Sequence, residues 1–86
     1  MPTISEFFGI LIRMYYDDHN PPHFHAYYSG HEAIISIQTM EIMEGELPRR
    51  AKALVMEWAI EHRQDLLNDW NLAEQHQPLN RIDPLE

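Results

Sequence analysis

The hydrophobic pattern changes its period once along the chain, and this change limits the fold more than any other feature. Up to residue 44, apolar residues alternate with polar ones in short runs separated by turn-forming residues, as in half-buried strands. From Arg49 to about Glu74 there is neither glycine nor proline, and apolar residues recur at helical spacing. The sequence therefore predicts an α+β fold, in which an antiparallel sheet of three to five strands packs against one long C-terminal helix, or against two helices bent near Arg63 and Gln64.

The expected strands follow the runs of alternation, and all 86 residues are expected to form a single domain (residues 1–86). The expected strands are Gly9–Asp17, His23–Ser29, Ala33–Gln38 and Glu41–Glu44, preceded by a short strand or extended arm over Thr3–Phe8. Two prolines in Asp18–Pro22 and the pair Ser29-Gly30 mark turns between them.

The predicted helix has one apolar face. Pro48 suits its first residue, and at about 100° per residue one stripe carries Leu47, Ala51, Leu54, Val55, Trp58, Ala59, Leu66 and Ala73, with Trp70 at its edge. We expect Trp58 to be buried against Ile12, Met14 or Ile35. His62 falls within the stripe, which favours a buried histidine with a hydrogen-bond partner over a metal ligand.

Three further apolar residues fall on the opposite side of the helix, where solvent-facing side chains are normally polar. Met56, Ile60 and Leu67 lie at about 140–180° from the stripe and form a row. Two explanations remain open. The tail, with Leu79, Ile82 and Leu85, folds over the row, or the row binds a protein partner or a second copy of the chain.

The charge of the chain argues against nucleic-acid binding. The net charge is −8 with histidine neutral, which repels a phosphate backbone over most of the surface. Arg49, Arg50 and Lys52 nevertheless crowd the first turn of the helix, where the helix dipole favours acidic residues. They are either solvated charge or a small basic patch for an acidic partner or a phosphate.

The composition points to a cytoplasmic protein. The chain has no cysteine, which fits a reducing compartment, and no window approaches the ~20 apolar residues of a membrane span. Its first residues carry neither a basic start nor a small-residue cleavage site, so we expect no signal peptide.

Half of the six histidines lie in the twelve-residue stretch DDHNPPHFHAYY, from Asp17 to Tyr28. A hairpin closed symmetrically about Asn20 would place Asp17 opposite His23, Tyr15 opposite His25 and Arg13 opposite Tyr27. Because alternate residues share a face, these six side chains would form a polar cluster on the 10–29 hairpin. The other face, with Ile12, Met14, Tyr16, Phe24, Ala26 and Tyr28, would pack on the helix.

Three interpretations of the polar face remain open. His23 and His25 could bind Zn²⁺, with Asp17 or His19 adding a ligand. Alternatively, the two histidines could act as acid and base in RNA cleavage, with Arg13, Tyr15 and Tyr27 as further catalytic residues and the arginine stabilising the phosphorane. In the third interpretation, aromatic and imidazole side chains only stabilise an exposed sheet by cross-strand pairing.

The sequence also resembles a family, the domain of unknown function 4160. The resemblance rests on MPTIS at the start, on the DDHNPPHFH loop, and on LPRRA leading into a helix with EWA and HR. Members are small prokaryotic proteins without an assigned activity, often encoded beside another small protein in an arrangement like that of toxin–antitoxin pairs. The chain departs from the family pattern at QTMEI, where a glycine-containing hairpin turn is expected.

Together these features predict a small cytoplasmic protein that acts through a protein partner, as one component of a toxin–antitoxin-like pair. The alternative is an enzyme that uses the polar face of the 10–29 hairpin, either a histidine-dependent ribonuclease or a metal-dependent hydrolase.

Overall fold

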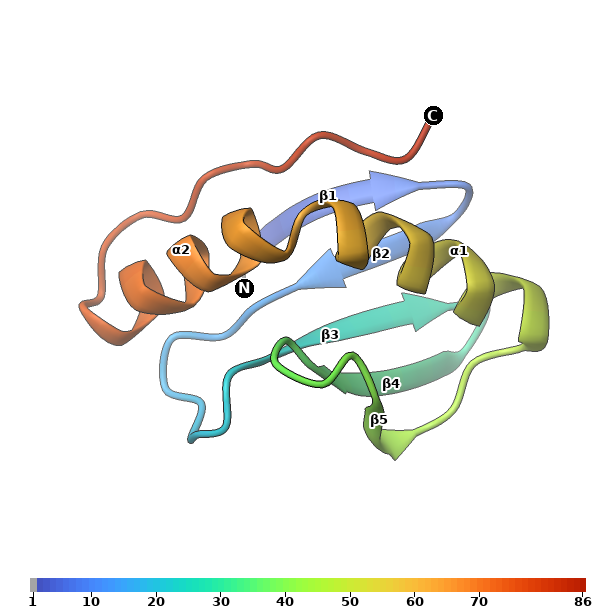
Figure 1. Cartoon of the computed structure of the whole chain (residues 1–86), viewed down its shortest axis with the longest axis horizontal. Coiled ribbons are helices and arrows are strands. Elements are labelled where there is room, and N and C mark those ends of the chain that lie inside the picture. Colours follow the sequence, from blue (N-terminus) through green and yellow to red (C-terminus); the bar gives the residue numbers. More distant parts are fainter. Residues whose placement is uncertain (1) are drawn as a thin grey trace.

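The chain forms one five-stranded antiparallel sheet whose strands follow their order in the sequence, covered on one face by two helices (Figure 1). The computed structural model describes residues 2–86. The strands are β1 (Thr3–Phe7), β2 (Ile10–Arg13), β3 (His23–Tyr28), β4 (His31–Ser36) and β5 (Ile42–Gly45). The helices are α1 (Arg49–Glu61) and α2 (Arg63–Glu74). The α+β class is confirmed, and the five strands of the antiparallel sheet fall within the predicted three to five.

The register between β2 and β3 differs from the predicted one by two residues. Arg13 lies opposite His25 and Leu11 opposite Tyr27, whereas a symmetric hairpin would have placed Arg13 opposite Tyr27. The cause is the length of the connection, because β2 ends at Arg13 and residues 14–22 form a loop. A shift of two residues leaves every side chain on its predicted face, since side chains alternate with a period of two.

The turns of the other hairpins contain residues in the left-handed backbone conformation, with positive φ angles. Phe8 and Gly9 join β1 to β2, and both have positive φ angles, 49° and 78°. Between β4 and β5 the left-handed residue is Met40, with φ at 61°, and its N–H donates to the Ser36 carbonyl. The turn at QTMEI is therefore formed without the glycine that the family pattern suggests.

The alternative of one long helix is wrong, and the alternative of two helices is confirmed, because the helix is interrupted at His62, next to the bend predicted near Arg63 and Gln64. This residue leaves helical geometry, at φ −113° and ψ 23°, and its N–H is shared between the carbonyls of Trp58 and Ala59. The His62 ring lies 5.6 Å from the Trp58 ring. Its Nδ1 is 3.1 Å from the Asp65 carboxylate, so the expected hydrogen-bond partner is present, although the ring is only half-buried.

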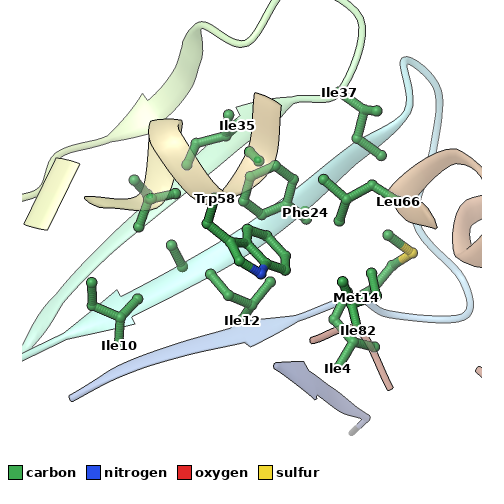
Figure 2. Packing of buried hydrophobic residues seen from close by; sticks show 14 of the residues in the cluster. Ile4, Ile10, Ile12, Met14, Phe24, Ile35, Ile37, Trp58, Leu66 and Ile82 are labelled. Atoms are coloured by element: carbon green, nitrogen blue, oxygen red, sulfur yellow. The ribbon is translucent and has the colours of Figure 1, made fainter. Parts of the chain in front are cut away.

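The core lies between the sheet and the helices, with Trp58 at its centre (Figure 2). Trp58 is fully buried, as predicted, in one cluster with Ile12, Met14 and Ile35, and its ring lies 5.9 Å from that of Phe24. The predicted helical stripe is buried except at Leu54, which is half-buried. Neither helix of residues 2–86 is long and apolar enough to cross a lipid bilayer.

The C-terminal tail runs extended along β1 and the neighbouring side of the helices (Figure 1). The Ile82 N–H donates to the Ile4 carbonyl at 2.8 Å, and the Trp58 indole N–H donates to the Asp83 carbonyl at 2.7 Å. Ile82 thereby enters the core. The tail does not cover Ile60, which is 61% exposed.

Candidate metal centre

Two histidines of β3 are buried on the sheet face that the helical stripe does not cover. Phe24 and Ala26 point into the core, so alternation directs His23 and His25 to the other face. Each of these two residues is nevertheless only 8% exposed. The His23 ring lies 5.1 Å from the Trp70 ring of α2, and the His25 ring lies 4.5 Å from the Tyr15 ring. Buried imidazoles of this kind need polar partners, because a buried polar group without one is costly.

The loop between β2 and β3 supplies a carboxylate to both histidines. Asp18 Oδ2 lies 3.1 Å from Nε2 of His23 and 3.1 Å from Nε2 of His25. Asp18 itself is half-buried, with 27% of its side chain exposed. The three ligand atoms lie within 4.8 Å of one another, so this group could hold a metal ion.

The second nitrogen of each ring faces an acceptor. His23 Nδ1 lies 2.8 Å from the Pro21 carbonyl, and His25 Nδ1 lies 3.2 Å from Oε2 of Glu32. A carbonyl and an ionised carboxylate can only accept, so each Nδ1 carries a proton and donates it. In a neutral imidazole the Nε2 atom is then bare, and both bare nitrogens face the same carboxylate oxygen.

Two bare nitrogens beside a carboxylate oxygen repel one another unless a cation lies among them. The cation can be a proton on one or both rings, or a metal ion held by all three atoms. With zinc bonds of about 2.0–2.1 Å and tetrahedral angles, neighbouring ligand atoms lie about 3.3 Å apart, close to the 3.1 Å distances here. Metal-bound histidines also commonly donate the other ring N–H to a carbonyl or carboxylate, as His23 and His25 do.

Two tyrosines flank His25 on the same face. The hydroxyls of Tyr15 and Tyr27 are hydrogen-bonded to each other, and the Tyr27 ring is stacked on the His25 ring at 6.4 Å. Burial raises the pKa of the Tyr27 hydroxyl, and its bond to Tyr15 and the nearby Glu32 raise that pKa further. Tyr27 therefore stays a neutral phenol, able to donate a hydrogen bond, well above neutral pH.

An arginine completes this face. The Arg13 guanidinium carbon lies 5.2 Å from the centre of the Tyr27 ring, and its Nε donates to the Thr3 hydroxyl at 3.2 Å.

Next to Asp18 there is a hollow of about 430 Å³, lined by Pro2, Tyr15, Tyr16, Asp17 and Asp18. The candidate metal ligands Asp18, His23 and His25 therefore lie next to a space large enough for a small molecule.

The predicted catalytic residues lie on one face: Arg13, Tyr15, His23, His25 and Tyr27. The predicted metal ligands are only partly brought together. His23 and His25 belong to the group, but His19 is exposed outside it, and Asp17 is exposed with its carboxylate 3.8 Å from His76.

Sequence reasoning missed Asp18 and Glu32. Asp18 was assigned to the turn because a symmetric hairpin needs Asp17 on the histidine face, whereas the longer loop turns Asp18 back toward β3. Glu32 lies opposite Tyr27. Extending the expected strand at Ala33 back by one residue would have placed Glu32 on the face of the histidines, since alternate residues share a face.

The helical row predicted to bind a partner is only partly exposed. Met56 and Leu67 are half-buried and pack against the core, whereas Ile60 is 61% exposed. Partner binding at this row stays a prediction.

Comparison with known proteins gives one match. The family described as a domain of unknown function, DUF4160, matches residues 9–71, which include Asp18, His23, His25, all of α1 and most of α2. No curated protein matches the chain, and no solved structure does. Because the match covers more than half of the chain, the protein belongs to the DUF4160 family.

Proposed function

We propose that this protein is a metal-dependent hydrolase, in which Asp18, His23 and His25 hold a divalent transition-metal ion such as Zn²⁺. The observation that carries the proposal is the position of both Nε2 atoms, each 3.1 Å from Asp18 Oδ2, while both Nδ1 atoms face fixed acceptors. Two imidazoles and a carboxylate suit zinc and related ions, and three protein ligands leave a position open.

The same geometry favours a metal over a histidine-dependent ribonuclease. Acid–base cleavage needs one neutral and one protonated histidine at the start of the reaction. Here one carboxylate oxygen lies 3.1 Å from both Nε2 atoms, so this geometry does not distinguish an acid from a base. The net charge of −8 further opposes the approach of a polyanionic substrate.

The protein's own groups suggest how a substrate would be held. A bound divalent ion supplies Lewis-acid polarisation of a carbonyl or phosphoryl oxygen. The hollow beside Asp18 gives the substrate space, with Tyr15 and Tyr16 among its walls. The phenol of Tyr27 stays protonated at neutral pH. Its hydroxyl is hydrogen-bonded to that of Tyr15, which lines the hollow.

Metal content tests the first step of the proposal. We expect the gently purified protein to carry about one zinc ion per chain, and the metal-free protein to take up Zn²⁺ or Co²⁺ at the same stoichiometry in calorimetry. His25→Ala and Asp18→Asn should abolish this uptake. His31→Ala is the matched control, because His31 is exposed at the start of β4 and lies outside the group.

Hydrolysis tests the second step. We expect the metal-loaded protein to cleave an activated ester or an activated phosphodiester, and the metal-free protein and His25→Ala not to do so. Stoichiometric binding without any hydrolysis would leave a metal-binding protein and remove the enzyme from the proposal. Sub-stoichiometric metal in the unmutated protein would contradict both the metal site and the hydrolase activity.

We also propose that the protein acts in the cytoplasm through a protein partner, as one component of a toxin–antitoxin-like pair. The resemblance suggests the pair, and exposed large hydrophobic residues at Phe8, Met43 and Ile60 supply contact surface. Expression of this chain and of its genomic neighbour, singly and together, tests the proposal. Growth arrest by one chain, relieved by the other, is the expected result, and no arrest in any combination would contradict it.

A further inference from the structure

The turn between β1 and β2 exposes an aromatic residue at a cost to the fold. Phe8 and Gly9 have φ angles of 49° and 78°, the pattern of a type I′ turn, which strongly favours asparagine at the first position. A phenylalanine in the left-handed region is strained, and here the strain brings no core packing, because Phe8 is 60% exposed. Neither turn formation nor burial therefore explains the phenylalanine.

A hollow of about 150 Å³ lies beside Phe8, at the start of α1. Its walls are mostly apolar, and its lining residues are Phe8, Tyr28, Pro48, Arg50, Ala51 and Leu54. A space of this size can take one bulky apolar side chain. Arg50 is the charged residue among those that line it, so an entering side chain would sit next to a cation.

Three cations lie in the first turn of α1 without partners of their own, and one of them, Arg50, lines this hollow. Arg49, Arg50 and Lys52 are all exposed, and across residues 2–86 none of their side chains takes part in an ion pair or a side-chain hydrogen bond. They are half of the six lysines and arginines in a chain with net charge −8. The first turn of α1 contains no acidic residue, so the cluster opposes the helix dipole as well.

We propose that this surface docks an acidic segment of another protein, with one bulky apolar side chain in the hollow beside Phe8, one carboxylate on Arg50 at the hollow, and further carboxylates on Arg49 and Lys52 of the same helical turn. The strained exposed aromatic, the apolar hollow and the unpaired cations are complementary to such a segment in shape and in charge. The proposal rests on the protein-partner function proposed above, and it is independent of the metal centre.

The surface suits a peptide better than a nucleic acid. Binding to a phosphate backbone depends on many cationic contacts along the strand, whereas this patch has three in a strongly negative chain. The apolar hollow would also gain little from a sugar–phosphate backbone. In a segment with one leucine or phenylalanine between glutamates, the apolar side chain can enter the hollow and the glutamates can contact the cations.

The test uses the full chain and a fluorescent peptide with a central leucine flanked by glutamates, followed by anisotropy. Phe8→Asn should weaken binding about tenfold, because buried aromatic contacts dominate such interfaces. The same change should raise the stability of the protein, because Asn-Gly suits the turn, so lost binding cannot be ascribed to unfolding. Arg50→Glu should also weaken binding about tenfold and reduce its dependence on salt.

Ile60→Asn is the matched control, because Ile60 is as exposed as Phe8 but lies on the helical row instead. This variant should bind the peptide as the unmutated protein does. The proposal is overturned if the peptide does not bind, if a lysine-flanked peptide or a single-stranded oligonucleotide binds as tightly, or if Phe8→Asn leaves binding unchanged. Self-association of the chain that Phe8→Asn abolishes would also overturn it, because the occupant would then be a second copy.

These outcomes separate the docking surface from the proposed partner function. The partner function stands or falls on growth arrest and its relief in coexpression. If relief occurs and survives Phe8→Asn but not Ile60→Asn, the partner function holds, and the docking surface is the helical row and not this hollow.

Discussion

Strand β3 is buried on both of its faces, and the two faces are buried in different ways. Toward the helices, Phe24 and Ala26 are fully buried among apolar side chains. On the other face, His23 and His25 are 8% exposed, beneath the loop that carries Asp18. One face excludes water by hydrophobic packing, whereas the other does so with ionisable groups that a small domain does not need for its core.

Hydrogen bonding distinguishes the faces further. Nδ1 of His23 and of His25 each donates a hydrogen bond, and both Nε2 atoms face the Asp18 carboxylate oxygen that would share a cation with them. The buried side-chain atoms without a partner among residues 2–86 are Ser5 Oγ, on a residue that pairs with Ile12 on the apolar face, and Asp69 Oδ2 on α2. Buried polar atoms on the histidine face therefore have more of their contacts made than those on the helical side. This contrast teaches that burial alone does not identify a core, and that a fully partnered buried cluster is a better sign of a site.

The largest effect is expected from breaking the apolar face at Trp58. Trp58→Ala should lower the free energy of unfolding by about 3–5 kcal/mol, because it removes a fully buried ring and the indole bond to the tail. A domain of this size has little more stability than that, so the variant should be largely unfolded in chemical denaturation. Ile60→Ala, exposed on the same helix, should change stability by no more than about 0.5 kcal/mol. Equal midpoints for Trp58→Ala and the unmutated protein would show that the apolar face does not hold the fold.

An intermediate effect is expected on the polar face, and only with metal. Zn²⁺ at about one hundred times its dissociation constant should raise the free energy of unfolding by about 2.7 kcal/mol, because the ion binds only the folded site. His25→Ala should lose this gain, whereas His31→Ala should keep it. A zinc-induced rise of the same size in His25→Ala would place the ion elsewhere.

The smallest effect is expected at Asp69, a buried charge on the helical side. Burial raises the pKa of its carboxyl, the Asn80 N–H lowers it, and the neighbouring Asp65 raises it again. Because the folded-state pKa lies above the unfolded value, the stabilising contribution is complete below the unfolded pKa and is lost as the pH rises through the folded one. Asp69→Asn should therefore be the more stable protein at neutral pH, by about 1 kcal/mol, since the charged carboxylate oxygen has no partner.

Unfolding curves at several pH values check this expectation. The difference between Asp69→Asn and the unmutated protein should shrink as the pH falls below the range in which Asp69 titrates. Asp17→Asn is the control, because that side chain is 91% exposed and should show no such difference. An Asp69→Asn protein that is less stable at neutral pH would mean that the bond from Asn80 outweighs the cost of the buried charge.

The sequence by itself determined which side chains share a face. Alternation in GILIRMYYD and HFHAYY assigned Phe24 and Ala26 to the core and His23 and His25 to the other face, and the two-residue shift in register did not change this. The helical stripe through Ala51, Val55 and Trp58 was predictable for the same reason. Strand and helix periods are local properties of the backbone, so they follow from the order of residues alone.

The tertiary structure alone decided which partners these faces meet. Asp18 replaces Asp17 beside the histidines because residues 14–22 form a loop, and the path of a loop depends on what it packs against. The helix breaks at His62 without glycine or proline, where the ring lies against Trp58. The tail lies along β1 because Ile82 finds space in the core there. None of these outcomes follows from the strand or helix period, because each depends on which side chains pack together in the folded chain.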